Sequence, residues 1–380
     1  MADRIRVGIV GLKPDISWAA RAHIPALRKL SGMFEIAGVA NTSLASAEEA
    51  AAAYDIPRAF ANVRELAASP DIDLIAVTVR VPFHLELVRA AVDAGKHVYC
   101  EWPLGNGLTE AEEMAAMVRD KGVLGVAGTQ ARVAPEIRYL RHLVQDGYVG
   151  EVLSSTITAH GRSWGPVHTD FANRGYLLDN RNGASMLTIP FGHTIAAVRD
   201  VLGDFSALTA IIENRRKEIL LPETGRIVPF DTPDQIAVCG RIGADVPIVM
   251  HYRGGMPRGD SGFEWQINGT TGDLRVTGLH GGAQQVELTL EGAKGVDDPF
   301  RRLDLPAEYA GGNWPDHIYP ANVARLYALM GADIQNGTHT APTFDDAVEL
   351  HRVIDTMERA SAERTWLPVS APSRPLPEVV

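Results

Sequence analysis

Short apolar runs alternate with longer segments of helical pattern through the first third of the chain. The run 5–10 ends at Gly11, and the segment that follows is rich in alanine as far as Leu30. Apolar runs of the same kind recur at 34–40, 58–60, 73–79, 97–101 and 123–127. Nearly continuous apolar strands that alternate with helices are typical of a parallel sheet covered on both faces. The pattern therefore predicts a doubly wound α/β domain over residues 1–129.

The pattern changes at residue 130. Residues 130–367 hold consecutive strand-like segments, several of them separated by tight turns such as Asn268-Gly269. Strands are predicted at 152–159, 207–212, 235–238, 247–252, 263–267, 273–276 and 285–290, and helices at 135–145, 320–334 and 344–360. We therefore expect an α+β domain with a large, mainly antiparallel sheet. The proline-rich residues 368–380 are expected to form an extended tail.

Charge and composition narrow the classes of partner. The chain of 380 residues has 36 basic and 47 acidic residues, a net charge of −11, which repels nucleic-acid phosphates and anionic lipid. No stretch approaches the about 18 apolar residues that a membrane span needs. We expect neither a nucleic-acid nor a membrane partner. The two cysteines, Cys100 and Cys239, cannot form a disulfide framework, so a reducing, cytoplasmic location is expected.

Two other kinds of chemistry find no support in the motifs. His160 and His168 lack the spacing and the cysteine or glutamate context of metal ligands, so no metal site is expected. The G-x-S-x-G turn of serine hydrolases is missing from the sequence.

The turn after the first strand is a candidate dinucleotide site. Glycine there lets a pyrophosphate approach the backbone, and a helix N-terminus attracts its charge. Gly11 is present, but the later glycines of G-x-G-x-x-G are replaced by residues 12–16, which include a proline. Lys13 and Ser17 are candidates to contact phosphate in their place. An ordinary strand–turn–helix without a ligand explains this motif equally well.

Neutral polar residues follow the second strand. Asn41 stands where an acidic residue binds the ribose 2′-hydroxyl in NAD sites. Asn41 and Ser43 can hydrogen-bond either a 2′-hydroxyl or a 2′-phosphate, so the sequence does not choose between NAD and NADP. Capping of the local turn is an equally good interpretation of both residues.

Several strings together resemble one family over residues 5–367. They are Gly8-Ile9-Val10-Gly11, His23-Ile24-Pro25-Ala26-Leu27, Gly95 to Leu104, Asp146 to Val152, Gly192-His193 and Pro342 to Ala347. In this order and spacing they resemble the glucose–fructose oxidoreductase/inositol dehydrogenase (Gfo/Idh/MocA) family. The resemblance implies a Rossmann domain that binds NAD or NADP. It also implies a second domain that provides the substrate site and an oligomer face, so a homodimer or homotetramer is expected.

The long turn after Gly11 and the segment around His193 resemble most closely the branch of the fungal galactose-pathway repressor, a regulator with this fold. Family dehydrogenases carry a lysine in Glu-Lys-Pro, and an aspartate four residues before a histidine. Here Trp102 replaces the lysine and Ile189 replaces the aspartate, while His193 remains. His193 is therefore the candidate general base. A buried structural histidine is the alternative interpretation.

Four further residues at the carboxyl ends of the fourth and fifth strands are candidates for cofactor contact, because ligands bind at that edge. They are Arg80, His84, Glu101 and Trp102. Glu101 is expected to support the nicotinamide ribose, and His84 to start a helix near the cofactor. Trp102 offers an apolar wall for a sugar or nicotinamide, or a wedge between domains.

The second domain adds four candidate substrate residues: Arg132, His160, Trp164 and Tyr176. Aromatic faces stack on sugars while polar groups bind hydroxyls. An interdomain ion pair is an equal alternative for Arg132, and ordinary loop composition explains the other three.

The sequence leaves two candidate functions for the protein. One is an NAD(P)-dependent oxidoreductase that oxidises a hydroxyl of a sugar, cyclitol or sugar-derived substrate. The other is a non-catalytic regulator that responds to dinucleotide or sugar.

Overall fold

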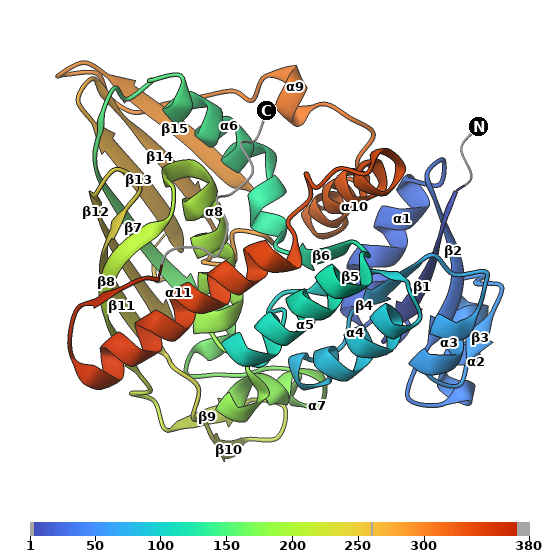
Figure 1. Ribbon diagram of the computed structural model, residues 1–380. Helices are drawn as coiled ribbons and strands as arrows, with labels where there is room; N and C mark the ends of the chain where they lie inside the picture. Colours follow the sequence, from blue (N-terminus) through green and yellow to red (C-terminus); the bar gives the residue numbers. More distant parts are fainter. Residues whose placement is uncertain (1–3, 260, 371–380) are drawn as a thin grey trace. The chain divides into compact units, whose positions relative to one another are not determined.

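The computed structural model describes residues 4–259 and 261–370, which form two compact units (Figure 1). Of the described residues, the first unit contains 4–130 and 312–349, and the second contains 131–259, 261–311 and 350–370. The sequence pattern assigned all of 130–367 to one domain. Residues 312–349 instead pack in the first unit, where Tyr327 stacks on Tyr99 with 4.8 Å between ring centroids.

The first unit is built on a parallel sheet in the order β3-β2-β1-β4-β5-β6. Its strands are β1 (Ile5–Val10), β2 (Phe34–Ala40), β3 (Ala59–Phe60), β4 (Leu74–Val77), β5 (His97–Glu101) and β6 (Gly125–Gly128). The doubly wound sheet predicted from the apolar runs is confirmed. The strand order reverses between β1 and β4, and in open α/β folds ligands bind at the carboxyl edge of such a switch point.

Helices connect these strands. They are η1 (Ala19–His23), α1 (Ile24–Lys29), α2 (Leu44–Ala53), α3 (Val63–Ala68), η2 (Val81–Phe83), α4 (His84–Asp93), α5 (Leu108–Lys121) and, from the later segment, α10 (Ile318–Asn336). The last helix, α11 (Phe344–Glu363), begins in the first unit and continues into the second. Gly331 of α10 allows close packing, because a Cβ there would lie 2.2 Å from the sulfur of Met33.

The second unit holds a nine-stranded sheet in the order β16-β15-β14-β13-β7-β12-β11-β8-β17. Its strands are β7 (Val152–Gly161), β8 (Phe205–Glu213), β11 (Gln235–Ile242), β12 (Val246–Gly254), β13 (Phe263–Gly269), β14 (Gly272–Gly278), β15 (Leu288–Lys294), β16 (Arg301–Arg302) and β17 (Leu367–Pro368). The sheet is antiparallel except for the parallel pair β7–β12. The mainly antiparallel sheet expected from the sequence is confirmed.

One face of this sheet is buried and the other exposed. In β12, Ile248, Met250 and Tyr252 are buried, whereas Val249 and His251 between them are exposed. This alternation is the normal pattern of an antiparallel sheet with one covered face. The helical segments of the unit are α6 (Pro135–Gln145), η4 (Arg162–Trp164), α7 (Phe171–Arg174), η5 (Gly175–Leu178), η6 (Asn180–Asn182), η7 (Leu187–Phe191), α8 (Gly192–Leu202) and α9 (Ala307–Ala310).

Two features of the second unit differ from the sequence prediction. A separate hairpin, β9 (Glu218–Leu221) with β10 (Arg226–Pro229), was not predicted, because strands of four residues give little periodic signal. The start of the expected tail is an edge strand: β17 pairs with β8, and the N–H of Val369 donates to the Ser206 carbonyl at 2.9 Å. The rest of the expected tail, 371–380, lies outside the described residues. Within the described chain, no helix is long and apolar enough to cross a membrane.

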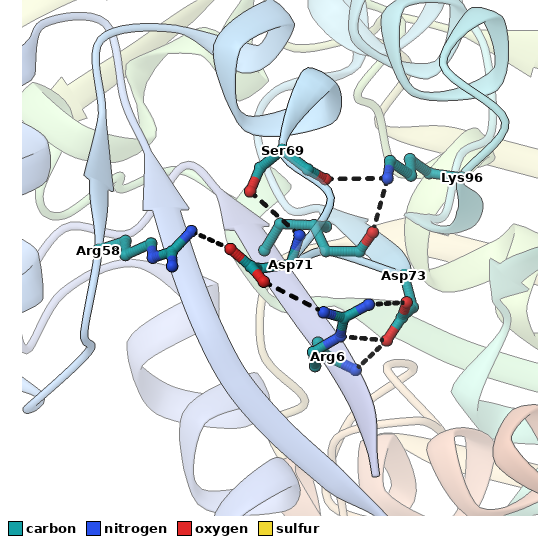
Figure 2. Close-up of polar contacts among 7 residues, drawn as sticks. Arg6, Arg58, Ser69, Asp71, Asp73 and Lys96 are labelled. Atoms are coloured by element: carbon teal, nitrogen blue, oxygen red, sulfur yellow. Dashed lines mark hydrogen bonds and ion pairs between the residues drawn. The ribbon is translucent and has the colours of Figure 1, made fainter. Parts of the chain in front are cut away.

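A polar network joins the amino ends of β1 and β4 (Figure 2). The Arg6 guanidinium donates to both carboxylate oxygens of Asp73, at 2.7 and 2.9 Å, and its backbone N–H donates to the same carboxylate at 2.9 Å. Lys96 donates to the carbonyls of Ser69 and Ile72 at 3.0 and 2.7 Å. These contacts fix the loop between α3 and β4 at the edge opposite the switch-point ligand edge.

Replacing Asp73 with asparagine is expected to reduce the free energy of unfolding by about 1 kcal/mol at pH 7, since the bidentate pair is partly solvent-screened. Hydrogen bonding by Arg6 lowers the pKa of Asp73 below its usual 3.8. The pair therefore stabilises fully above that usual value and is lost as the pH falls below it. Urea unfolding at pH 7 and at pH 3.5 should show that the difference in the free energy of unfolding between wild type and Asp73→Asn is smaller at the lower pH.

The control is Glu35→Gln, which removes an ion pair with Arg4 whose side chains are 41% and 50% exposed. Its effect should stay below about 0.5 kcal/mol. If the difference in the free energy of unfolding between wild type and Asp73→Asn grew toward low pH, the ion pair of Asp73 with Arg6 would not be the source of the stabilisation.

Candidate functional site

The turn that follows β1 is closed by its own side chains. Gly11 has a φ of +97°, and a Cβ there would lie 2.5 Å from the Val79 side chain. The N–H of Lys13 donates to Ser17 Oγ at 3.0 Å, and Ser17 Oγ donates back to the Lys13 carbonyl at 2.8 Å. Ser17 also accepts from the N–H of Ala20 at 3.2 Å, so it caps the next helical segment. The exposed Lys13 side chain is left as the positive charge of the turn.

Asn41 and Ser43 hold the same region together. Asn41 Oδ1 accepts from the N–H of Leu12 at 3.0 Å, while Nδ2 donates to the carbonyls of Leu12 and Ser46 at 2.8 and 2.9 Å. Ser43 Oγ accepts from the N–H of Ser46 at 3.3 Å and caps α2. This geometry favours turn capping by Asn41 and Ser43, the second interpretation that the sequence allowed, over hydrogen bonding to the 2′ group of the ribose.

Glu101 lies at the carboxyl end of β5 in a network of side chains from four segments. His23 Nε2 lies 2.9 Å from Glu101 Oε1, and its Nδ1 lies 2.8 Å from the hydroxyl of Tyr327. Gln130 Nε2 donates to both carboxylate oxygens, at 3.0 and 2.8 Å. The network needs a glycine beside it, since a Cβ on Gly128 would lie 2.9 Å from Glu101 Oε2.

This network keeps Glu101 ionised. Burial acts to raise the pKa of Glu101, but hydrogen bonds from His23 and Gln130, together with the nearby Trp18 indole, lower it below its usual range. The indole N–H of Trp18 is buried and makes no hydrogen bond within the described chain, although it lies close enough to Glu101 to contribute. Glu101 is therefore a fixed carboxylate at the ligand edge of the sheet.

The other candidates at this edge have distinct positions. The ring nitrogens of His84 lie 3.0 Å from the Leu104 carbonyl and 3.1 Å from the Val79 carbonyl, so His84 joins the loops that follow β4 and β5. Burial lowers the pKa of His84. This geometry supports the structural role expected for it. Trp102 is only 5% exposed, and Arg80 is exposed at the start of η2.

In the second unit, His193 lies in the first turn of α8 and is 3% exposed. The preceding segment η7 is a π-helix that contains Ile189 and Pro190. Single π-turns inside helices occur often at functional sites. The next residue, Thr194, bonds the hydroxyl of Tyr252 at 2.6 Å and fixes the helix on the sheet.

Arg132 forms an ion pair within the second unit. Its Nε donates to Asp200 Oδ2 at 2.8 Å, and both side chains are less than one-fifth exposed. This pair joins η3 (Gln130–Val133) to α8.

His160 and Trp164 present buried nitrogen donors. Arg253 Nε donates to His160 Nε2 at 2.6 Å, so the neutral ring carries its proton on Nδ1. That Nδ1 and the indole nitrogen of Trp164 are buried and have no hydrogen-bond partner among the described residues. Burial and the charge of Arg253 lower the pKa of His160, which favours this neutral form. Tyr176 is half-buried in η5.

Sequence reasoning missed several residues of these networks. His23 stood in a recognised string but had no role assigned, and Tyr327 lies 304 residues further along the chain, so no local pattern links them. His280 was not noticed, yet burial, with Arg162 nearby, lowers its pKa to about 4. The described residues contain no cluster of three His, Cys, Asp or Glu side chains that could hold a metal ion.

Two family models match the chain. Residues 5–129 match the oxidoreductase family with an NAD-binding Rossmann fold (Gfo/Idh/MocA), and residues 135–278 match the C-terminal domain of Gal80p. A relative named dehydrogenase aclE, from Aspergillus oryzae, is 30% identical over 375 residues, which cover 95% of this chain and 97% of that protein.

A regulator and a further dehydrogenase are also similar. The galactose/lactose metabolism regulatory protein GAL80 of Saccharomyces cerevisiae is 27% identical over 96% of this chain and 94% of that protein. The crystal structure of its super-repressor mutant matches with a TM-score of 0.89 at 26% identity, over 98% of this chain and 100% of that one. Levoglucosan dehydrogenase, solved with NADH and L-sorbose, matches with a TM-score of 0.82 at 20% identity, over 98% and 100%, which shows a shared fold.

Proposed function

Because the chain belongs to the Gfo/Idh/MocA family of oxidoreductases with an NAD-binding Rossmann fold, we propose that it is an NAD(P)-dependent dehydrogenase. Its substrate is a hydroxyl of a sugar, cyclitol or sugar-derived molecule. Two separate observations carry the proposal, one within each unit: the ionised Glu101 at the carboxyl edge of the first unit's sheet, and the buried His193 at the start of α8 in the second unit.

The residues of the first unit fit a dinucleotide. Gly11 lets the chain turn closely at the end of β1, and the Lys13 charge suits a phosphate. The Glu101 carboxylate is an acceptor for ribose hydroxyls, and the buried indole N–H of Trp18 is a donor without a partner in the described chain. When bound, the nicotinamide supplies the hydride acceptor. The protein positions it and contributes the fixed charge at Glu101.

The proposed chemistry of the second unit is proton removal and hydroxyl binding. His193 accepts the hydroxyl proton of the substrate as general base. The Nδ1–H of His160 and the indole N–H of Trp164 are buried donors that suit the oxygens of a polyol, because a buried donor without an acceptor is costly. Tyr176 adds aromatic surface for the carbon face of a sugar.

Binding of NAD⁺ and NADP⁺ tests the first half of this proposal. Either cofactor, at about one hundred times its dissociation constant, should raise the free energy of unfolding by about 2.7 kcal/mol in thermal-shift or calorimetric experiments. The two affinities should differ by less than about tenfold, because neutral Asn41 neither attracts nor repels a 2′-phosphate. No stabilisation by either cofactor at millimolar concentration would refute a dinucleotide function.

Hydride transfer tests the second half. Purified protein, NAD⁺ or NADP⁺ and a panel of sugars, cyclitols and glycosides should produce reduced nicotinamide, followed at 340 nm. Absorbance that stays flat across the panel despite cofactor binding would count against an enzyme.

A second candidate function is a regulator that binds dinucleotide or sugar without chemistry. The observation that favours it is the pair of neutral apolar residues, Trp102 and Ile189, where the family pattern has lysine and aspartate. A protein that binds both ligands yet transfers no hydride fits this candidate.

A further inference from the structure

Glu101 is a buried carboxylate whose partners are hydrogen-bond donors. His23 and Gln130 approach its oxygens at 2.8 to 3.0 Å, and its side chain is 12% exposed. Within the described chain, no lysine or arginine forms an ion pair with it. Trp102, the next residue, is neutral. The hydrogen bonds hold the carboxylate in place, and its net charge depends on His23.

The hydrogen-bond pattern is complete with a neutral His23. Burial, together with the negative charge of Glu101, raises the pKa of Tyr327 well above its usual value, so the hydroxyl keeps its proton. In the neutral tautomer that satisfies both contacts, the Tyr327 hydroxyl donates to His23 Nδ1 at 2.8 Å and His23 Nε2–H donates to Glu101 at 2.9 Å. With this arrangement every member is satisfied and the cluster carries one negative charge, that of Glu101.

The position of this charge matters for a dinucleotide. In a doubly wound sheet each half binds one mononucleotide at the carboxyl edge, and β4, β5 and β6 form the half opposite to that of β2. Asn41, at the end of β2, marks the adenosine half. Glu101, at the end of β5, therefore belongs to the nicotinamide half.

We infer that Glu101 makes the site distinguish the redox state of the cofactor, binding the oxidised, positively charged nicotinamide more tightly than the reduced, neutral one. This rests on the proposed function, since it requires a dinucleotide in the first unit. The oxidised and reduced cofactors share their phosphates and adenosine. The positive charge of the oxidised nicotinamide ring is therefore the main difference to which a fixed carboxylate responds. A buried carboxylate attracts that charge strongly because the surrounding dielectric is low.

The experiment measures the dissociation constants of NAD⁺ and NADH, and of NADP⁺ and NADPH, by titration calorimetry. Wild type should bind the oxidised form at least about tenfold more tightly. A tenfold preference corresponds to a two-electron potential about 30 mV lower for the bound cofactor. Glu101→Gln keeps the side-chain shape and removes the charge, so both forms should bind with nearly equal affinity.

Two variants serve as controls. Asp73→Asn removes the same charge at the opposite edge of the sheet and should leave the wild-type preference unchanged. His23→Gln keeps one N–H donor near Glu101 and should change the preference by less than about twofold, because a neutral His23 adds no charge of its own.

The outcomes separate this inference from the proposed function. Failure of wild type to bind any of the four cofactors would overturn both. Binding without preference for the oxidised form, or a preference that persists in Glu101→Gln, would overturn the inference alone. A preference that rises strongly in His23→Gln would show that His23 is a cation that neutralises Glu101, and would overturn the charge assignment. Where Glu101→Gln fails to fold, a wild type that shows no preference for the oxidised form still overturns the inference.

Discussion

Turnover should fall by about 10²–10⁴ when His193 is replaced by asparagine, the usual range for loss of a positioned general base. The side chain is 3% exposed at the start of α8, and asparagine is polar and no larger, so the fold and cofactor affinity should persist. Steady-state kinetics on the best substrate of the panel, with dissociation constants for cofactor, measure both effects. The loss should appear in kcat, because the base acts on the proton that leaves in the transition state.

The pH profile provides a second readout. Wild-type activity should decline on the acidic side, since a protonated imidazole cannot accept the hydroxyl proton, and the variant should lack this limb. His339→Asn is the matched control, because His339 is exposed in the first unit and has no proposed part in the reaction. A His193→Asn enzyme with wild-type turnover would remove His193 from the mechanism.

Replacing Gly254 with alanine should reduce the free energy of unfolding by about 3 kcal/mol. Gly254 ends β12 opposite Gly161 of β7, and a Cβ there would lie 1.8 Å from the carbonyl oxygen of Trp164 and 2.8 Å from its carbonyl carbon. These are backbone atoms, so relief requires movement of the segment that holds Trp164. Thermal unfolding measures the loss, and a raised KM for the substrate would report the displaced Trp164.

Gly32→Ala is the control, since a Cβ there meets no atom within 4 Å. Its stability should stay within about 0.5 kcal/mol of wild type. Wild-type stability in Gly254→Ala would mean that β12 and the segment after β7 are not packed as described.

The periodicity of the sequence was enough to place most regular elements. The run from Ile5 to Val10 is continuous and apolar because β1 is buried on both faces, and the alternation in β12 arises because one face of its sheet is covered. The hairpin of β9 and β10 was missed because its strands are too short to show a period. The assignment of 312–349 was missed because periodicity does not show which unit a helix packs against.

Local motifs placed the candidate residues at the carboxyl edge of the parallel sheet, but they did not assign a role to each residue there. Asn41 was a candidate to read the ribose, and only the folded turn shows that its amide bonds Leu12 and Ser46. Glu101 was recognised from its place at the end of a strand. Its partners come from segments that no short motif connects.

The sequence by itself determined the doubly wound sheet, the antiparallel sheet and the family, because these depend on patterns repeated along the chain. The tertiary structure alone decided the charge and geometry at Glu101. His23 and Tyr327 are 304 residues apart, and they meet only when α10 returns to pack on the first unit. A hydrogen-bond network of this kind depends on distances of a few tenths of an ångström between groups far apart in the chain, and residue order carries no such information.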